Sequence, residues 1–560
     1  MNRNVESHFA LLPHVDISRS TFDRSHSLKT SFNTGDVVPF YVDEVLPGDT
    51  FDLKTSKVVR MPSLITPIMD NIYLDTYYFF VPNRLTWEHW RELNGENNKS
   101  AWLPDVTYEV PQITAPPDTG WQIGSIADYM GIPTGVPGLS VSALPFRAYA
   151  LIMNEWFRDE NLTDPLVVPT DDATVAGTNG TNYLTDVAKG GMPFKAAKYH
   201  DYFTSCLPSP QKGPDVTIPV AQANPFPVYS GVETPFVSGN SPLSFRSVDN
   251  GSSTFSTGTD YMLNLSGYLS GTTRLGVAAI GGGSTRPTFQ ESLEPANLWA
   301  YPGAEATVAS INQLRQAFQI QKLYEKDARG GTRYIEILKA HFGVTSPDAR
   351  LQRPEYLGGN RIPINVNQIV QNSQTTDQSP QGTPVGLSLT SDTHSDFRKS
   401  FVEHGFIIGL MVARYDHTYQ QGLERFWSRR DRFDYYWPVF ANLGEQAVKN
   451  KEIYAQGNEQ DDEVFGYQEA WADYRFKPSH VTGEMRSQSP QTLDSWHLAD
   501  KYDTLPSLSD SWIREDPIPV DRVIAVTSAI THQFFADIYI SCRSTRPMPM
   551  YSVPGLVDHH

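Results

Sequence analysis

The stretch FFADIYISC, residues 534–542, decides the class of fold that the sequence predicts. Its apolar and polar residues alternate with a period of two, which is typical of a β-strand with one buried face. The apolar face consists of Phe534, Ala536, Ile538, Ile540 and Cys542. We therefore expect a strand here that packs one face on a hydrophobic core.

Other strands are predicted far from this one along the chain. Asn71–Val81 (NIYLDTYYFFV) is expected to form a long aromatic strand with Ile72, Leu74, Thr76, Tyr78 and Phe80 on one face. Phe406–Tyr415 is a short apolar run typical of a buried strand. Val37–Lys54 is expected to form two strands joined by a turn at Pro47-Gly48-Asp49. Because the strands are so widely separated, the sequence favours a sandwich or roll with long excursions over a compact meander.

Helices are fewer. Ala143–Asn161 carries an apolar stripe at helical spacing, with Pro145 suited to the first turn. Glu305–Ala328 is expected to form a second helix that breaks at Gly330-Gly331. A third is expected over Tyr334–Phe342, ending at Gly343.

The charge and cysteine content limit the function. The chain has 560 residues, with 63 acidic and 45 basic side chains and a net charge of −18, so contact with nucleic acid would need a local basic patch or a basic partner. Charged residues make up only 19%, against about 25% in ordinary globular proteins, which indicates surface hidden against other subunits. Two cysteines suit core thiols rather than disulfides or a zinc site. No signal peptide or membrane-spanning stretch is apparent.

Motifs of catalysis are missing. The chain has no Gly-Lys pair for a phosphate loop, no His-Glu pair for a zinc hydrolase and no G-x-S-x-G elbow. Some acid–histidine neighbours could build an acid–base or metal site: Glu403-His404, Asp416-His417, and His394 near Asp392 and Asp396. Structural or surface histidines are the favoured interpretation. We therefore expect no catalytic residue, no metal and no cofactor.

The strongest electrostatic pattern is LERFWSRRDRFDYY, residues 423–436. Guanidinium groups bind phosphate and aromatic rings stack on unpaired bases, so the pattern suits single-stranded nucleic acid. The residues predicted to bind it are Arg425, Trp427, Arg429, Arg430 and Arg432. The alternative is an interface in which each arginine meets Glu424, Asp431, Asp434 or a neighbouring subunit, and the interleaved acids favour this alternative.

Further basic residues lie near both ends of the chain. Arg19, Arg24 and Lys29 form a stretch that would suit a mobile arm reaching phosphate, or equally an arm lying over a neighbouring subunit. The first interpretation adds these three residues to the predicted nucleic-acid site. Arg543 and Arg546 follow the last predicted strand.

Leu207–Gln290 differs from the rest because about half of its residues are Gly, Pro, Ser or Thr. A structureless loop of this length is improbable inside a compact domain. It nevertheless contains large apolar side chains: Phe226, Phe236, Phe245, Phe255, Tyr261, Leu263 and Tyr268. Either these side chains pack against symmetry copies of the insertion, or the insertion forms a small β-domain closed on itself. The sequence leaves both open.

Several segments resemble the major capsid proteins of gokushoviruses, small single-stranded DNA phages of the microvirus family. The matching segments occur in order from end to end: Asp16–Phe51, Asp75–Asn97 (DTYYFFVPNRLTWEHWRELNGEN), Leu323–Val344, Asp348–Gly359, Glu484–Tyr502 and Phe534–Leu556. The resemblance implies a mainly β fold, an eight-stranded antiparallel jelly roll with long loop and helical insertions. It divides the chain into a first shell part with an N-terminal arm (1–206), a protrusion on the three-fold axes that serves host attachment (207–290) and a second shell part with helical insertions (291–560).

The same resemblance implies a function without catalysis. The subunit would form pentamers and then a T=1 icosahedral shell around circular single-stranded DNA. Expected partners are copies of itself, the DNA genome, a small basic DNA-binding protein, a pilot protein, an internal scaffolding protein and a host cell-surface receptor, with no membrane insertion. The protein would be made in the host bacterial cytoplasm and end in the virion. The alternatives are a carbohydrate-active β-sandwich enzyme and a phage attachment protein.

Overall fold

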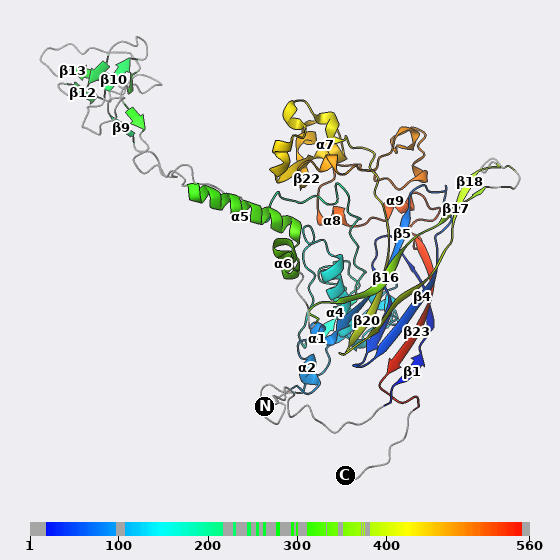
Figure 1. The fold of residues 1–560 in the computed structure, drawn as a ribbon. Helices are drawn as coiled ribbons and strands as arrows, with labels where there is room; N and C mark the ends of the chain where they lie inside the picture. The colour runs from blue at the N-terminus through cyan, green and yellow to red at the C-terminus, as the bar shows by residue number, and fades with distance from the viewer. Residues whose placement is uncertain are drawn as a thin grey trace. The chain divides into compact units, whose positions relative to one another are not determined.

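The structure of the chain, a computed structural model, divides into two compact units: Met1–Lys212 with Tyr324–His560, and Gly213–Leu323. It describes residues 18–96, 107–214, 311–331, 333–344, 351–370 and 381–551, the single residues 216, 372 and 375, and seven short strands between 228 and 300. Figure 1 shows the larger unit as a β-sandwich carrying long insertions.

The first sheet of the sandwich is antiparallel and has the order β1-β23-β4-β19, with β2 also paired to β23. Its strands are β1 (Ser20–Asp23), β2 (His26–Phe32), β4 (Thr50–Arg60), β19 (Thr390–Ser400) and β23 (Phe534–Arg546). Ser20 lies opposite Arg546, and His26 lies opposite Ile540, so β1 and β2 follow one continuous register along β23. The two therefore occupy a single edge position, interrupted only at residues 24 and 25.

The second sheet is also antiparallel and has the order β16-β5-β20-β3. Its strands are β3 (Val38–Val45), β5 (Ile72–Pro82), β16 (Glu355–Pro363) and β20 (Gly405–Tyr415). Strands pair across long stretches of chain in a nested order: β2 with β23, β3 with β20, β4 with β19, and β5 with β16. This nesting is the connectivity of a jelly roll, and the predicted mainly β antiparallel fold is confirmed.

The turn at residues 47–49 connects the two sheets rather than closing a hairpin. It joins β3 of the second sheet to β4 of the first, so the two strands predicted over 37–54 exist but do not pair with each other. Gly48 has a φ of +91°, a left-handed conformation that favours glycine. The strand predicted over 534–542 begins at Phe534, as expected, and runs on to Arg546.

Burial explains why the two sheets have different sequence patterns. In β4 and β23 every second residue is buried, because only one face packs on the core between the sheets. In β5 and β20 nearly every residue is buried. A second core covers the other face of these strands, where Phe79 and Leu410 pack with Phe146 and Tyr149. The near-continuous apolar runs in the sequence therefore mark a sheet covered on both faces.

The element that covers this face is α4 (Leu144–Ile152), which continues as a π-helical turn over Met153–Phe157. The helix predicted over 143–161 is therefore confirmed but ends at Phe157. Shorter elements accompany it: α1 (Asn83–Thr86), α2 (Trp90–Leu93), β6 (Gln112–Thr114), α3 (Ile126–Tyr129), β7 (Ser140–Ser142), β8 (Val175–Ala176) and a 3-10 turn at Val187–Lys189. The three strands form one small sheet beside the sandwich.

Residues 416–533 form an insertion between β20 and β23, called here the β20–β23 insertion. Its main elements are β21 (Glu445–Lys449), α7 (Asn450–Ile453), β22 (Val464–Glu469), α8 (Asp510–Ile513) and α9 (Ile518–Asp521). It has a core of its own, in which Phe203 and Cys206 pack with Tyr419, Ile453 and Phe465. Cys206 and Cys542 are both buried free thiols, and burial raises the pKa of each, as expected for core cysteines.

Two helices precede β16. These are α5 (Ile311–Gly330) and α6 (Tyr334–Phe342), and the break predicted at Gly330-Gly331 is confirmed. Gly331 and Gly343 have φ angles of +87° and +69°, left-handed conformations at the two helix ends. Between β16 and β19 lies a hairpin of β17 (Val366–Val370) and β18 (Pro384–Ser388). Of the helices in the described residues, none is both long and apolar enough to cross a membrane.

The unit Gly213–Leu323 contains short antiparallel strands in three small sheets. The strands are β9 (Val228–Ser230), β10 (Ser244–Ser247), β11 (Thr254–Ser256), β12 (Tyr261–Asn264), β13 (Gly276–Ala279), β14 (Leu293–Pro295) and β15 (Leu298–Ala300). Phe245 lies opposite Phe255, Tyr261 opposite Ala279, and Leu263 pairs with the residue at 277. Phe226, Phe236 and Tyr268 lie outside the described residues.

Candidate assembly and nucleic-acid surfaces

The arginine-rich stretch over 423–436 lies in the β20–β23 insertion and folds into 3-10 turns. These turns are Arg425–Ser428, Arg432–Asp434 and, just beyond the stretch, Pro438–Asn442. The Asp431 carboxylate accepts hydrogen bonds from the backbone N–H groups of Phe433 and Asp434, at 2.7 and 3.3 Å. Asp431 therefore caps a local turn, a role for which aspartate is well suited, whereas Glu424 pairs with Lys477 at 3.4 Å.

Two of the four arginines pair with acids far away in the sequence. Arg429 is 8% exposed, forms an ion pair with Asp473, and stacks on Tyr474 with its guanidinium carbon 4.3 Å from the ring centre. Arg425 lies 3.5 Å from Glu452 and donates to the Ala447 carbonyl at 2.9 Å. Both arginines thus hold parts of the insertion together.

Arg430, Arg432 and Trp427 point outward. All three side chains are exposed, and the Trp427 residue is 68% accessible. Arg432 lies over the ring of Phe433, 4.9 Å from its centre. Within the described part of the chain, neither Arg430 nor Arg432 has a carboxylate within ion-pair distance. These are the residues predicted within 423–436 that remain available to a partner.

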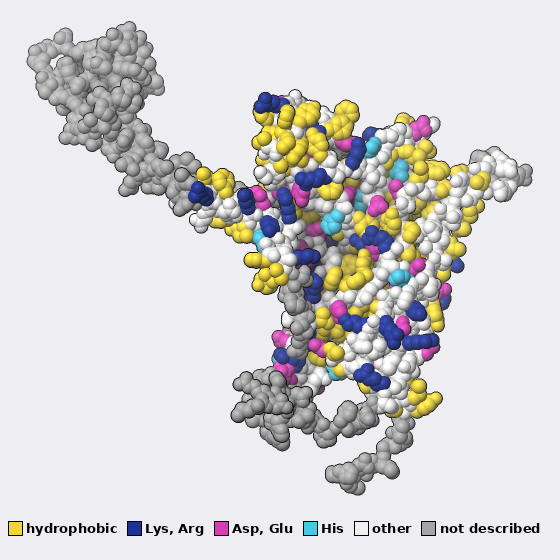
Figure 2. Space-filling view, viewed as in Figure 1, with side chains coloured by type: hydrophobic (Ala, Val, Ile, Leu, Met, Phe, Trp, Pro, Cys, Tyr) yellow, Lys and Arg dark blue, Asp and Glu magenta, His cyan; other side chains and the backbone are white. Residues whose placement is uncertain are grey.

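Exposed apolar side chains surround these residues. We call the following set the aromatic surface: Phe426, Trp427, Phe433, Tyr435, Tyr436, Trp437, Val439, Leu443, Tyr474 and Phe476. Figure 2 shows hydrophobic side chains gathered over the part of the molecule where Figure 1 places α7 and β22. Beside them lies a cavity of about 270 Å³ whose lining includes Phe203, Tyr419, Arg429 and Phe476.

The basic residues near the N-terminus differ in availability. Arg24 forms two hydrogen bonds to the carboxylate of Asp43, at 2.6 and 2.8 Å, and so stabilises the edge of the sandwich. Lys29 lies 3.7 Å from Asp537, and both side chains are largely exposed, so this pair contributes little. Arg19 is exposed beside Gly48. Arg19 and Lys29 can therefore reach a ligand, whereas Arg24 is already bidentately paired.

Lys29 belongs to a wider basic surface that the sequence did not reveal. The exposed face of the first sheet, called here the outer face, carries five basic side chains: Lys29, Lys54, Arg60, Arg398 and Arg543. It carries three acidic ones: Asp23, Asp52 and Asp537. The outer face is thus net positive by two, although the chain carries −18. Its residues come from strands hundreds of positions apart, and only alternation within each strand hinted at a shared face.

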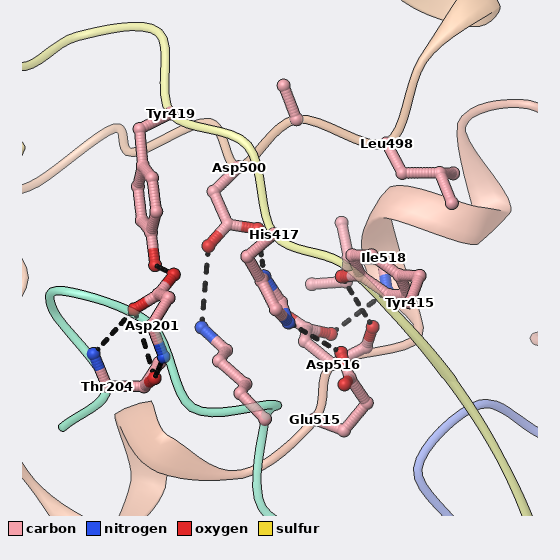
Figure 3. Close-up of polar contacts among 12 residues, drawn as sticks. Asp201, Thr204, Tyr415, His417, Tyr419, Leu498, Asp500, Glu515, Asp516 and Ile518 are labelled. Atoms are coloured by element: carbon pink, nitrogen blue, oxygen red, sulfur yellow. Dashed lines mark hydrogen bonds and ion pairs between the residues drawn. The ribbon is translucent and has the colours of Figure 1, made fainter. Parts of the chain in front are cut away.

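A buried ionic cluster lies within the β20–β23 insertion and links it to the chain segment that carries Lys198 (Figure 3). The two ring nitrogens of His417 lie 3.0 Å from Asp500 and 3.1 Å from Glu515. Lys198 approaches Asp500 to 3.5 Å, and the Tyr502 hydroxyl donates to the same carboxylate at 3.0 Å. The side chains of His417, Asp500 and Glu515 are at most 7% exposed. Segments distant in the sequence therefore meet at one point.

The cluster is charged. Burial alone lowers the pKa of His417, but the two carboxylates outweigh burial and raise it to about 10. For the Asp500 carboxyl, burial acts in the opposite direction and raises the pKa. The positive charges of His417 and Lys198 outweigh burial and lower this pKa well below its ordinary value. Within the described residues no group of three or more His, Cys, Asp or Glu side chains is arranged to hold a metal ion. The ion pairs of the cluster therefore link the chain segments that carry Lys198, His417, Asp500 and Glu515.

The other histidines considered in the sequence have different neighbours. The ring of His404 packs on Trp90, with ring centres 5.5 Å apart, while Glu403 pairs with Arg84 at 2.7 Å. Near His394, Asp392 lies 3.2 Å from the buried Lys57. Glu403 and Asp392 therefore each pair with a basic residue from elsewhere in the chain.

A nested antiparallel sandwich of two sheets is the jelly-roll architecture, which viral capsid proteins share with lectin domains and cupins. The chain belongs to the capsid protein (F protein) family, whose family model matches residues 10–556. The resemblance to phage major capsid proteins is thereby confirmed, and with it the role of a major capsid protein. As a member, the chain assembles with copies of itself into a shell and belongs to the virion.

Three curated relatives agree with this assignment, and each is a capsid protein VP1. The protein of Bdellovibrio phage phiMH2K is 42% identical over 99% of this chain and 98% of the relative. The protein of Chlamydia phage 1 is 43% identical over 99% of this chain and 98% of the relative. The protein of Spiroplasma virus 4 is 43% identical over 98% of this chain and 97% of the relative. These relatives are coat proteins rather than carbohydrate-active enzymes or attachment proteins.

Proposed function

We propose that this chain forms pentamers and then a T=1 icosahedral shell around circular single-stranded DNA, as a structural subunit without catalysis or cofactor. The observation that carries the proposal is membership of a capsid family across residues 10–556. Head-to-tail contacts whose rotations close generate such a shell from a single type of subunit. A small basic DNA-binding protein, a pilot protein, an internal scaffolding protein and a host receptor are the proposed partners. Assembly is proposed to occur in the host bacterial cytoplasm.

The outer face of the first sheet is the proposed contact with DNA. It is net positive on an acidic chain, and it exposes the rings of Phe535 and Tyr539 at 38% and 51%. Basic side chains bind backbone phosphate, and exposed rings stack on unpaired bases without regard to sequence. Lys29 and Arg19, both predicted from the sequence, lie on or beside this face, which supports their role. A basic partner protein would neutralise the remaining phosphate charge.

Residues 207–290 are proposed to form a protrusion on the three-fold axes of the shell. Two observations support this. The composition of this stretch differs from the rest of the chain, and Gly213–Leu323 forms a compact unit of its own. Deleting 207–290 should leave a folded subunit but abolish attachment to the host. A deletion variant that cannot fold would count against a separable protrusion.

The DNA contact is tested by reversing charge on the outer face. Lys29→Glu with Lys54→Glu changes the outer face from five basic and three acidic residues to three basic and five acidic residues. Electron micrographs should still show closed particles, with less nucleic acid per particle. A matched control reverses two exposed lysines elsewhere, Lys326→Glu with Lys501→Glu. Normal nucleic-acid content in the first variant would exclude the outer face as the DNA contact.

A further inference from the structure

The aromatic surface is too large for the exposed side of a protein that works as a monomer. Its ten side chains belong to residues that are 43–85% accessible. At 150–250 Å² per large side chain, they expose roughly 1,100 Å² of mostly apolar area. Apolar patches on monomers rarely exceed about 300–600 Å², whereas each partner of a stable protein–protein interface buries about 800 Å². The aromatic surface therefore has the size of one side of a complete interface.

The rings are held in place before any partner binds. The ring of Phe440 stacks on Trp471 at 6.1 Å and 22°, and the Trp471 indole N–H donates to the Phe440 carbonyl at 3.2 Å. Trp471 has a φ of +66°, a left-handed conformation that costs about 1–2 kcal/mol for a residue with a side chain. Such a conformation persists only where the surrounding packing enforces it.

Further bonds fix the outer part of the aromatic surface. The Trp437 indole N–H donates to the Arg432 carbonyl at 2.9 Å, and the guanidinium of Arg429 lies between Tyr435 and Tyr474, at 5.5 and 4.3 Å from the ring centres. A surface that is ordered in advance loses little conformational entropy on binding. Exposed aromatic rings with fixed positions are the anchors on which protein interfaces depend.

The local charge favours a protein partner over nucleic acid. The stretch 423–436 has four arginines and three acids, and its ion-pair partners from outside the stretch are Glu452, Asp473 and Lys477, so the group has no net charge. The outer face of the first sheet is net positive by two. Phosphate binding depends on surplus positive charge, so the outer face suits DNA and the aromatic surface does not.

We propose that the aromatic surface is one side of a head-to-tail interface with a second copy of this chain. The proposal rests on the shell function proposed above and names one of its contacts. Rings at the centre of the surface would be buried by the neighbouring copy. Arg430 and Arg432, which have no acidic partner in the described residues, would meet carboxylates of that copy, whose chain has 18 more acids than bases. Surplus acid on one copy and free guanidinium groups on the next are complementary.

The test places a charge in the aromatic surface without disturbing the core. Trp427→Asp with Val439→Asp alters residues that are 68% and 85% accessible, so the variant should fold and keep the wild-type thermal transition. Ile123→Asp with Ile530→Asp alters residues that are 79% and 80% accessible and lie outside the aromatic surface, which makes it a matched control. Loss of a central anchor weakens association about thirty-fold or more.

Sedimentation velocity and nucleic-acid content give distinct results. We expect the wild type and the control variant to assemble, while the aromatic variant stays folded and monomeric at the same concentration. Normal assembly of the aromatic variant would overturn the proposal, and normal assembly with reduced DNA content would assign the surface to single-stranded DNA instead. Wild-type oligomers that stay open but dissociate in the aromatic variant would support the interface and refute only the shell. A wild type that stays monomeric at every concentration would refute both.

Discussion

Replacing His417 by leucine tests whether the buried ionic cluster stabilises the folded chain. In the wild type the imidazole lies between Asp500 and Glu515, at 3.0 and 3.1 Å. Leucine fills a similar volume but leaves both carboxylates buried, with Lys198 3.5 Å from Asp500. Removing one member of a buried ion pair costs about 3–5 kcal/mol, because the remaining charge is uncompensated.

The pKa of His417 gives an independent figure of the same size. The shift from 6.5 to about 10 corresponds to about 5 kcal/mol at 1.36 kcal/mol per unit. Because the pKa is higher in the folded state than in the unfolded state, this stabilisation is complete below about pH 6.5. It declines as the pH rises and is lost once the pH passes the folded-state value of about 10.

Chemical denaturation at several pH values between 6.5 and 10 measures both effects. At pH 7 the His417→Leu variant should unfold at clearly lower denaturant concentration than the wild type. The difference in unfolding free energy should then narrow towards pH 10, because the wild type alone loses the imidazolium. His200→Leu alters an exposed histidine and serves as the control. A difference that is small at pH 7, or that stays constant up to pH 10, would show that His417 is not held as a charged group by its neighbours.

Three further predictions concern single residues. Asp75 is 2% exposed between Arg361 and Arg414, which outweigh burial and lower the pKa of its carboxyl, so Asp75→Asn should cost about 3 kcal/mol at pH 7. The cost should shrink below about pH 4 in an acid-unfolding series, since the lowered pKa gives stability only above the unfolded value. Gly359→Ala should prevent folding, because at φ +149° a Cβ would overlap the Thr76 carbonyl oxygen, whereas Gly457→Ala, with open space around it, should give soluble subunit. Trp471→Gly should relieve about 1–2 kcal/mol of backbone strain but lose more from ring packing, so a raised melting temperature would contradict the anchoring role of the indole.

The sequence predicted the sandwich because its signals are local. Alternation in 534–542 follows directly from a strand with one buried face, and the structure buries the same five residues. The apolar run at 406–415 became β20, which has both faces covered. Pairing between strands was not readable in this way, because it depends on chain segments that meet only in the folded state. Thus the strands at 38–45 and 50–60 were found, but their assignment to different sheets was not.

The partners of the side chains could not be predicted either, because they too come from segments that meet only in the folded state. The sequence placed Asp416 beside His417, whereas the structure supplies Asp500 and Glu515 from later loops. The acids close to Arg429 in sequence cap turns, and its partner, Asp473, lies 44 residues further on. The sequence therefore located the arginine-rich and histidine-containing segments but not the residues with which their side chains pair.

The position of the ionic cluster links the stability of the insertion to the aromatic surface. Tyr419, two residues from His417, donates to Asp201 at 2.6 Å and packs on Phe203, with ring centres 4.7 Å apart. The neighbouring Tyr202 donates to Glu452 at 2.8 Å, and Glu452 in turn pairs with Arg425 at the edge of the aromatic surface. Packed apolar side chains could supply equal stability at such a site, but directional bonds between fixed charges also set orientation. If the aromatic surface must meet a neighbouring copy at one angle, assembly requires the cluster to fix the orientation of the insertion that carries this surface. An all-apolar cluster that restores the stability of the subunit should therefore still assemble less regularly than the wild type.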